Sequence, residues 1–182
     1  YLNKYSELGI KLKDLENHSE GLFCFIGGEF NPLLILHNEN KNTDKIIIDL
    51  KKIFSNNLLF ELQRIEDLEI DSFEEYLIKK SNDYEIPLIG SNNIKFGDDD
   101  DFSAHDALLC VAQKTTVNNG NRKTSNNQLS FKSTNKMYEI FNDIPDIIEN
   151  NYNVALSCNY YPIEVLPKLP KFKNENNLSE NQ

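Results

Sequence analysis

The sequence predicts an α/β fold, in which short parallel strands alternate with helices. Three apolar runs, at residues 22–26, 58–62 and 86–90, have the length and composition of buried strands. Helical patterns with short connections separate these runs. This strand-helix alternation implies parallel strands joined by right-handed crossovers, hence a sheet or a barrel.

Local signals set the boundaries of the elements. Asn31 and Pro32 are a typical N-cap and first-turn proline. Ser72 and Glu75 have the spacing of a capping box, which predicts a helix start at Ser72. The predicted elements, in order, are a strand at 22–26, helices at 31–37 and 43–54, a strand at 58–62, a helix from 72 to about 82, a strand at 86–90, and helices at 102–112, 133–141 and 145–158.

The segments between these elements are rich in turn-forming residues. Gly27 and Gly28 directly follow the first strand and predict a tight turn rather than a phosphate-binding loop. Residues 118–127 are polar and predict a surface loop. From Pro162 the chain is punctuated by prolines and predicts an extended linker, and the last ten residues are expected to be disordered.

The composition excludes several classes of function. Lys and Arg together number 19 and Asp and Glu 29, which gives a net charge of -10. A surface that binds nucleic acid by itself needs clustered basic residues to neutralise phosphates, so we do not expect this chain alone to bind DNA. The mean hydropathy of -0.54 and the lack of a long apolar run argue against a membrane-spanning helix.

Cysteine usage favours a cytoplasmic location. Cys24, Cys110 and Cys158 stand far apart with no C-x-x-C spacing, as expected of buried thiols in a reducing compartment. No charged-then-apolar leader opens the chain, so we expect no signal peptide. The first residue is Tyr1 rather than Met, which suggests a piece of a longer protein.

Candidate site residues follow the predicted strands, because active sites in parallel α/β folds gather at the carboxyl ends of strands. These ends lie at 27–29, 63–66 and 91–96. Glu61, in the second strand, is a candidate metal ligand or general base, and equally a candidate for a buried ion pair with Arg64.

Other chemical groups have ordinary structural explanations. The four carboxylates at 98–101 lack the alternate spacing of a calcium loop and predict a solvated acidic loop. Arg122 and Lys123 are only a weak signal for phosphate contact. No Ser-His-Asp set, zinc signature or P-loop is present. The histidines lack metal-ligand spacing and are expected at the surface or as caps; they are His18, His37 and His105.

Several strings of the sequence, taken together and in this order, resemble one known family. Each string alone is weak, but the ordered combination is specific and covers roughly residues 15–172. The family is the bacterial DNA polymerase III alpha subunit, a replicative C-family polymerase, in its N-terminal PHP (polymerase and histidinol phosphatase) domain and the start of the connection to the palm. The strings lie at 15–22, 60–64, 86–93, 104–110 and 143–150.

The resemblance implies a fold and a domain division. Residues 1–97 would be the second half of a distorted (β/α)7 PHP barrel, 98–161 a helical extension toward the palm, and 162–182 a linker and tail. The whole polypeptide would be a DNA-directed DNA polymerase, with Mg²⁺ in a palm domain outside this chain. Its implied partners are the proofreading exonuclease subunit, other holoenzyme subunits and, through domains outside this chain, primer-template DNA.

The resemblance also identifies positions at which family members hold metal ions. The family resemblance implies three metal ligands within this chain. One is a His soon after the string Glu-Leu-Gln-Arg, and the other two are the Asp and His of a Thr-Asn-Asp-x-His string. Here Ile65, Asn93 and Lys95 occupy those positions. Ile has no lone pair, an amide is a weaker ligand than a carboxylate, and an ammonium group repels cations. We therefore expect a vacated metal site, no catalytic, cofactor-binding or metal-ligating residues in this chain, and an ion pair between Lys95 and a carboxylate such as Glu61.

Two functional hypotheses follow. The favoured one is a structural and interaction domain that supports the polymerase core and docks the exonuclease subunit. The alternative is a metal-dependent phosphoesterase or 3'-5' proofreading nuclease of the PHP family, which would need other residues in place of the missing ligands. A stand-alone small-molecule phosphatase is disfavoured, because the His105 and Asp106 pair resembles the polymerase branch; we expect helix-capping or interdomain hydrogen bonds from this pair.

Overall fold

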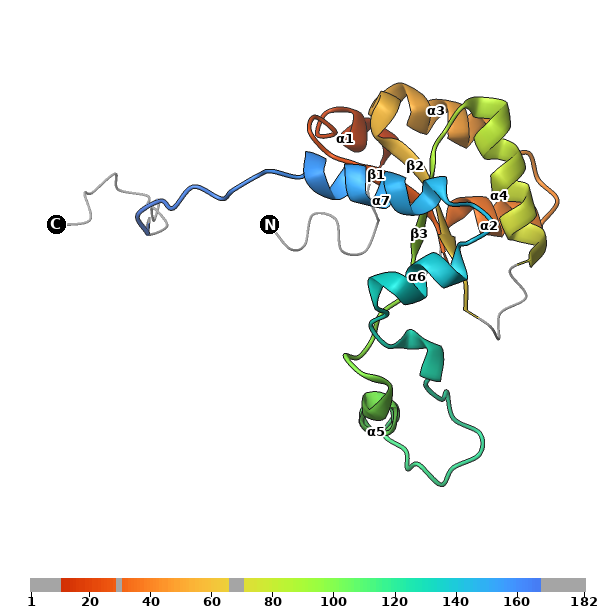
Figure 1. Ribbon diagram of the computed structural model, residues 1–182, viewed down its shortest axis with the longest axis vertical. Helices are drawn as coiled ribbons and strands as arrows, with labels where there is room; N and C mark the ends of the chain where they lie inside the picture. The colour runs from red at the N-terminus through yellow and green to blue at the C-terminus, as the bar shows by residue number, and fades with distance from the viewer. Residues whose placement is uncertain (1–10, 29–30, 66–70, 168–182) are drawn as a thin grey trace, which may run out of the picture.

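A three-stranded parallel sheet lies at the centre of the molecule. The computed structural model describes residues 11–28, 31–65 and 71–167 (Figure 1). The strands are β1 (Cys24–Gly27), β2 (Leu58–Gln63) and β3 (Leu88–Ser91), in the order β1-β2-β3 with both pairs parallel. This arrangement confirms the predicted α/β class and the parallel pairing; a closed barrel stays a prediction.

The helices from α2 to α7 fall close to the positions that the sequence predicts, whereas α1 was not predicted. Asn31 caps the first helix after β1, since its side-chain oxygen accepts a hydrogen bond from the Leu34 amide at 2.9 Å. Ser133 caps a later helix in the same way through the Lys136 amide. The elements other than strands are α1 (Leu12–Glu16), α2 (Pro32–Asn38), α3 (Asp44–Phe54), η1 (Ser55–Asn57), α4 (Asp71–Tyr84), η2 (Asp99–Asp101), α5 (Phe102–Gln113), η3 (Asn127–Leu129), α6 (Thr134–Ile140) and α7 (Asp146–Ser157).

One predicted helix start differs from the structure. Because α4 begins at Asp71, Ser72 lies within its first turn rather than at the N-cap. The extended linker is described as far as Pro167 and has no regular structure there. The predictions for residues 168–182, and those for Glu29 and Glu66, lie outside the described residues.

The main hydrophobic core lies on one face of the sheet. Alternate residues of β2, namely Leu58, Phe60 and Leu62, point into it. Helices α2, α3, α4 and α7 cover this face, because each contributes an apolar stripe to the same cluster. The helix residues buried in it are Leu33, Ile47, Leu50, Phe54, Phe73, Leu77, Ile147 and Ile148.

Helix α7 closes the outer edge of β3. The side chain of Asn151 accepts a hydrogen bond from the Gly90 amide at 3.1 Å and donates one to the Gly90 carbonyl at 2.6 Å. Asn150 donates to the Leu88 carbonyl at 2.8 Å. These amides take the place of a neighbouring strand, so the β3 edge is satisfied by side chains. No helix in the described ranges has the length and apolar character needed to cross a membrane.

Helix α5 and the loop after it form a lobe away from the sheet and its helices (Figure 1). The chain enters this lobe after β3 and leaves it before α6. The segment that enters the lobe and the segment that leaves it lie side by side. The Phe131 amide donates to the Phe96 carbonyl at 3.1 Å, and the Lys95 amide donates to the Leu129 carbonyl at 2.9 Å. The lobe is therefore attached next to the carboxyl end of β3.

Candidate functional site

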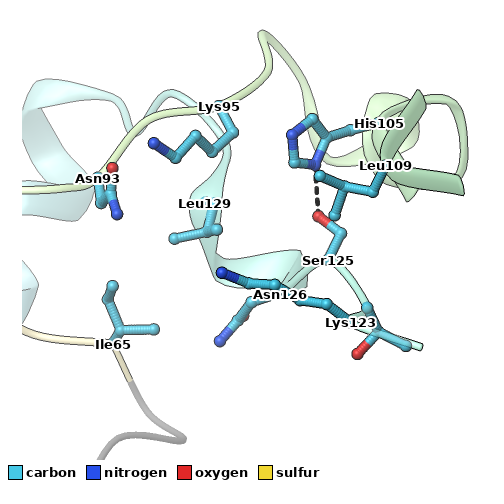
Figure 2. A pocket seen from close by; sticks show the side chains of 10 residues that line it. Ile65, Asn93, Lys95, His105, Leu109, Lys123, Ser125, Asn126 and Leu129 are labelled. Atoms are coloured by element: carbon cyan, nitrogen blue, oxygen red, sulfur yellow. Dashed lines mark hydrogen bonds between the residues drawn. The ribbon is translucent and has the colours of Figure 1, made fainter. Parts of the chain in front are cut away.

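A pocket of about 360 Å³ lies between the carboxyl ends of β2 and β3 and the α5 lobe (Figure 2). Strands β2 and β3 supply one wall through the residues that follow them, and α5 with the loop before η3 supplies the other. The residues that line it are Ile65, Asn93, Lys95, His105, Leu109, Lys123, Thr124, Ser125, Asn126 and Leu129.

The pocket brings together the three positions at which the sequence predicts lost metal ligands. Ile65 follows β2 and is buried, whereas Asn93 and Lys95 follow β3. Asn92, directly before them, donates from its side chain to the Ser130 carbonyl at 2.8 Å and so holds this segment in place. The sequence predicts that these positions share one site, and in the structure all three line the same pocket.

The lobe wall is ordered by a hydrogen bond between His105 and Ser125. His105 Nδ1 and Ser125 Oγ lie 2.5 Å apart, and the His105 ring packs beside Phe96 with centroids 5.4 Å apart. Figure 2 shows this pair on the side of the pocket opposite Asn93. Ser125 could not be expected at the site from the sequence, because it belongs to a polar loop without a motif.

Asp106 forms a bidentate ion pair with Arg122. The two Arg122 Nη atoms donate to the carboxylate oxygens at 2.7 and 2.6 Å, and the Ser125 amide donates to Asp106 Oδ1 at 3.0 Å. The Arg122 and Asp106 side chains are only 8% and 14% exposed. The guanidinium group and the amide lower the pKa of Asp106 to about 2.

These contacts decide two sequence-based expectations. The expectation of helix-capping or interdomain hydrogen bonds from His105 and Asp106 is wrong for the described residues: both side chains bond to the loop that follows α5, because that loop folds back along the helix. Arg122 is engaged by Asp106, so it does not present its guanidinium to a phosphate. Lys123, next to it, does line the pocket.

Glu61 makes neither of its expected ion pairs. Its carboxylate accepts hydrogen bonds from the Ser91 hydroxyl and from Gln63 Nε2, the latter at 3.2 Å. Arg64 lies three residues further on, so strand alternation turns it to the other face of the sheet. Within the described part of the chain no ion pair joins Glu61 to Lys95, which lies beyond the end of β3 at the pocket.

Arg64 instead connects three parts of the molecule. Its guanidinium donates to Glu74 of α4 at 2.6 Å, to Asp143 at 2.5 Å and to the Ile140 carbonyl at 2.6 Å. It also lies 4.9 Å from the centre of the Phe141 ring. Asp143 and then Glu74 raise the pKa of Arg64, and Arg64 lowers the pKa of Asp143. The sequence could not show this brace, since its members are up to 79 residues apart.

The remaining candidates lie outside the pocket. The acidic segment 98–101 is exposed, as predicted, and its first residue, Asp98, and last, Asp101, form a capping box. Cys110 is buried and burial raises the pKa of Cys24, but Cys158 is exposed, which corrects the expectation that all the thiols are buried. Among the described residues, no group of three or more His, Cys, Asp or Glu side chains is placed to hold a metal ion.

Comparison with known proteins gives one consistent result. The chain is 34% identical over 165 residues to the DNA polymerase III subunit alpha of Borreliella burgdorferi. It is 32% identical over 166 residues to that of Rickettsia bellii and 31% identical over 170 residues to that of Rickettsia conorii. This chain resembles a segment of the DNA polymerase III alpha subunit.

The similarity extends over most of this chain and over a small part of each relative. The three alignments cover 88%, 90% and 92% of the chain. The chain spans about 14% of the length of these alpha subunits. No protein-family model matches it. The similarity confirms the expected relationship to the DNA polymerase III alpha subunit, and the activity of those longer proteins belongs to the proposal below.

Proposed function

We propose that this chain is an architectural part of the alpha subunit of a bacterial replicative DNA polymerase. The whole subunit would carry out DNA replication as a nucleotidyltransferase, with Mg²⁺ held in a palm domain outside this chain. This part would be a section of a (β/α)7 PHP barrel with a helical extension. The similarity to the alpha subunits supports the assignment to a replicative polymerase. The parallel sheet with helices on one face is compatible with its being a section of a barrel.

The observation that carries the architectural role is the chemistry of the pocket. Ile65, Asn93 and Lys95 stand where the family resemblance places metal ligands. Exchanging a carboxylate for an amide and placing an ammonium group in the site changes the local charge by about two units, which disfavours a cation by several kcal/mol at an effective dielectric constant of about 20. These residues do not fit a metal cluster, and we derive no metal-dependent step from them.

Two features support a bracing role. Arg64 joins β2 and α4 to the segment before α7 through charged hydrogen bonds. Asn150 and Asn151 fix α7 along the β3 edge. Segments that follow the sheet in the sequence are thus bonded directly to it, as expected of a scaffold for further domains.

The apolar face of α5 supports an interaction role. Leu108 and Val111 are 63% and 73% exposed, and Ala104, one turn earlier, is exposed as well. Their i, i+4, i+7 spacing places them on one side of the helix. Exposed apolar patches of this kind mark contact surfaces. We assign this face to the proofreading exonuclease subunit; other holoenzyme subunits, and primer-template DNA, would contact parts outside this chain.

Metal content of the full-length alpha subunit, purified without chelator, tests the architectural role. Elemental mass spectrometry should find zinc, manganese and iron well below one ion per chain. Two or three ions per chain would contradict a vacated site and favour the alternative, a metal-dependent phosphoesterase or 3'-5' nuclease. As a matched comparison, a variant carrying Ile65→His, Asn93→Asp and Lys95→His should take up more metal than the natural chain.

A further inference from the structure

We propose that the pocket between β2, β3 and the α5 lobe binds a phosphate group. The inference rests on the proposed function only in requiring that the site hold no metal ions. Its basis is the set of groups that the fold directs into this space: two lysines, a histidine, two side-chain amides and two hydroxyl groups. Among the described residues that line the pocket there is no Asp or Glu.

The lysines reach the pocket from opposite walls on backbone segments that are held in place. Lys95 lies on the segment after β3, where its amide donates to the Leu129 carbonyl at 2.9 Å. Lys123 lies in the lobe, where its amide donates to Gln113 Oε1 at 3.0 Å and its carbonyl accepts from Gln113 Nε2 at 2.9 Å. Figure 2 shows Lys95 and Asn93 on one side of the space and His105 with Ser125 on the other.

The surroundings strengthen the attraction for an anion. Ile65, Leu109 and Leu129 give the pocket apolar walls, and charges beside low-dielectric walls interact more strongly than in water. The chain as a whole carries a net charge of -10, so a pocket with two ammonium groups is a local exception. Its volume of about 360 Å³ equals roughly a dozen water molecules and admits a tetrahedral phosphate with part of its hydration shell.

The donors match the needs of phosphate better than those of other ligands. A phosphate group accepts several hydrogen bonds at once, and Lys ammonium, amide N–H and hydroxyl groups are its usual partners. Asn93 and Asn126 supply amides and Ser125 a hydroxyl around the lysines. A metal ion would meet two ammonium groups, and an uncharged apolar ligand would leave them without a counter-charge.

Lysine footprinting on the full-length alpha subunit tests this inference. The rates at which an amine-acylating reagent modifies individual lysines are compared by mass spectrometry with and without millimolar inorganic phosphate, at ionic strength matched with sodium chloride. Phosphate should slow the modification of Lys95 and Lys123 at least about threefold, as expected at concentrations of about twice the Kd. Lys45 and Lys52, exposed on α3, should react at unchanged rates.

A variant separates specific binding from general screening. Lys123→Gln should abolish the protection of Lys95 by phosphate, whereas Lys136→Gln, which removes an exposed ammonium group on α6, should preserve it. Equal slowing of all lysines, or none at Lys95 and Lys123, would overturn the inference. Metal analysis of the same sample keeps the proposals apart: bound metal contradicts the architectural role, whereas lack of metal and lack of protection together contradict only phosphate binding.

Discussion

Gly27 shows how one residue limits the way two strands can pair. It lies opposite Glu61 in the register of β1 and β2. A Cβ atom at Gly27 would lie 1.9 Å from the Glu61 carbonyl oxygen, which is backbone and cannot rotate away. Only glycine therefore permits this approach of the two strands.

Replacing Gly27 with alanine should loosen the sheet. The clash must push β1 from β2, and overpacking of this kind costs about 3 kcal/mol. We expect amides of β1 and β2 to exchange hydrogen about 100-fold faster, measured by hydrogen-exchange mass spectrometry on the full-length subunit. Gly120→Ala is the control, because a Cβ there meets nothing within 4 Å. Unchanged exchange in Gly27→Ala would contradict the close approach.

At the scale of elements, the ion pair between Asp106 and Arg122 ties α5 to the loop that follows it. The partners are 16 residues apart, and the Ser125 amide adds a third contact to the carboxylate. The pKa of Asp106 is lowered, so the charged form is favoured in the folded state. By linkage, its stabilising effect is complete above the unfolded pKa near 4 and is lost as the pH falls through about 2.

This pH dependence predicts how acid affects the lobe. Pepsin, which is active in acid, should cut residues 114–125 more slowly in the natural chain than in Asp106→Asn at about pH 4. The difference should disappear as the pH approaches about 2, because Asp106 becomes protonated in the folded state as well. Asp99→Asn, at an exposed carboxylate, should match the natural chain throughout. Equal cleavage of Asp106→Asn and the natural chain at pH 4 would refute the stabilising role.

At the scale of the whole molecule, polar contacts join the sheet to its helices, and the α5 lobe lies apart from them. The Arg64 brace and the contacts of Asn151 with Gly90 hold α4, α7 and the sheet together. The α5 lobe extends away from this body and exposes Leu108 and Val111 (Figure 1). Exposed apolar side chains lie on the sheet helices as well, such as Ile35 of α2 and Leu156 of α7, so a binding measurement has to decide which surface is used.

Charge on the apolar face of α5 should weaken docking of the exonuclease subunit. We expect Leu108→Glu combined with Val111→Glu to lower the affinity of the full-length alpha subunit for that subunit at least about tenfold, or about 1.4 kcal/mol, in a direct binding measurement. Ile48→Glu, at a 41% exposed position on α3, is the matched control and should bind normally. Normal binding by the α5 variant would place the docking surface elsewhere.

The sequence by itself determined the three strands and the six longer helices and their order, but not α1 or the short helices η1, η2 and η3. Apolar periodicity and caps such as Asn31 and Ser133 are local, and the helices and strands they predict are present within one to two residues at most boundaries. The alternation of strands and helices predicts the parallel pairing, which the structure confirms. Ile65 and Lys95 directly follow predicted parallel strands, so the sequence also predicts that they lie at the same edge of the sheet.

Only the tertiary structure decided which polar groups meet. The sequence favoured Arg64 or Lys95 as partners of Glu61, yet Ser91 and Gln63 bond to that carboxylate. Arg64 pairs with Asp143, 79 residues away. Periodicity specifies which face of an element is buried, but the partner of a charged side chain depends on how elements distant in the chain pack. The opposing walls of the pocket between β2, β3 and the α5 lobe are brought together by that packing, and no local pattern encodes it.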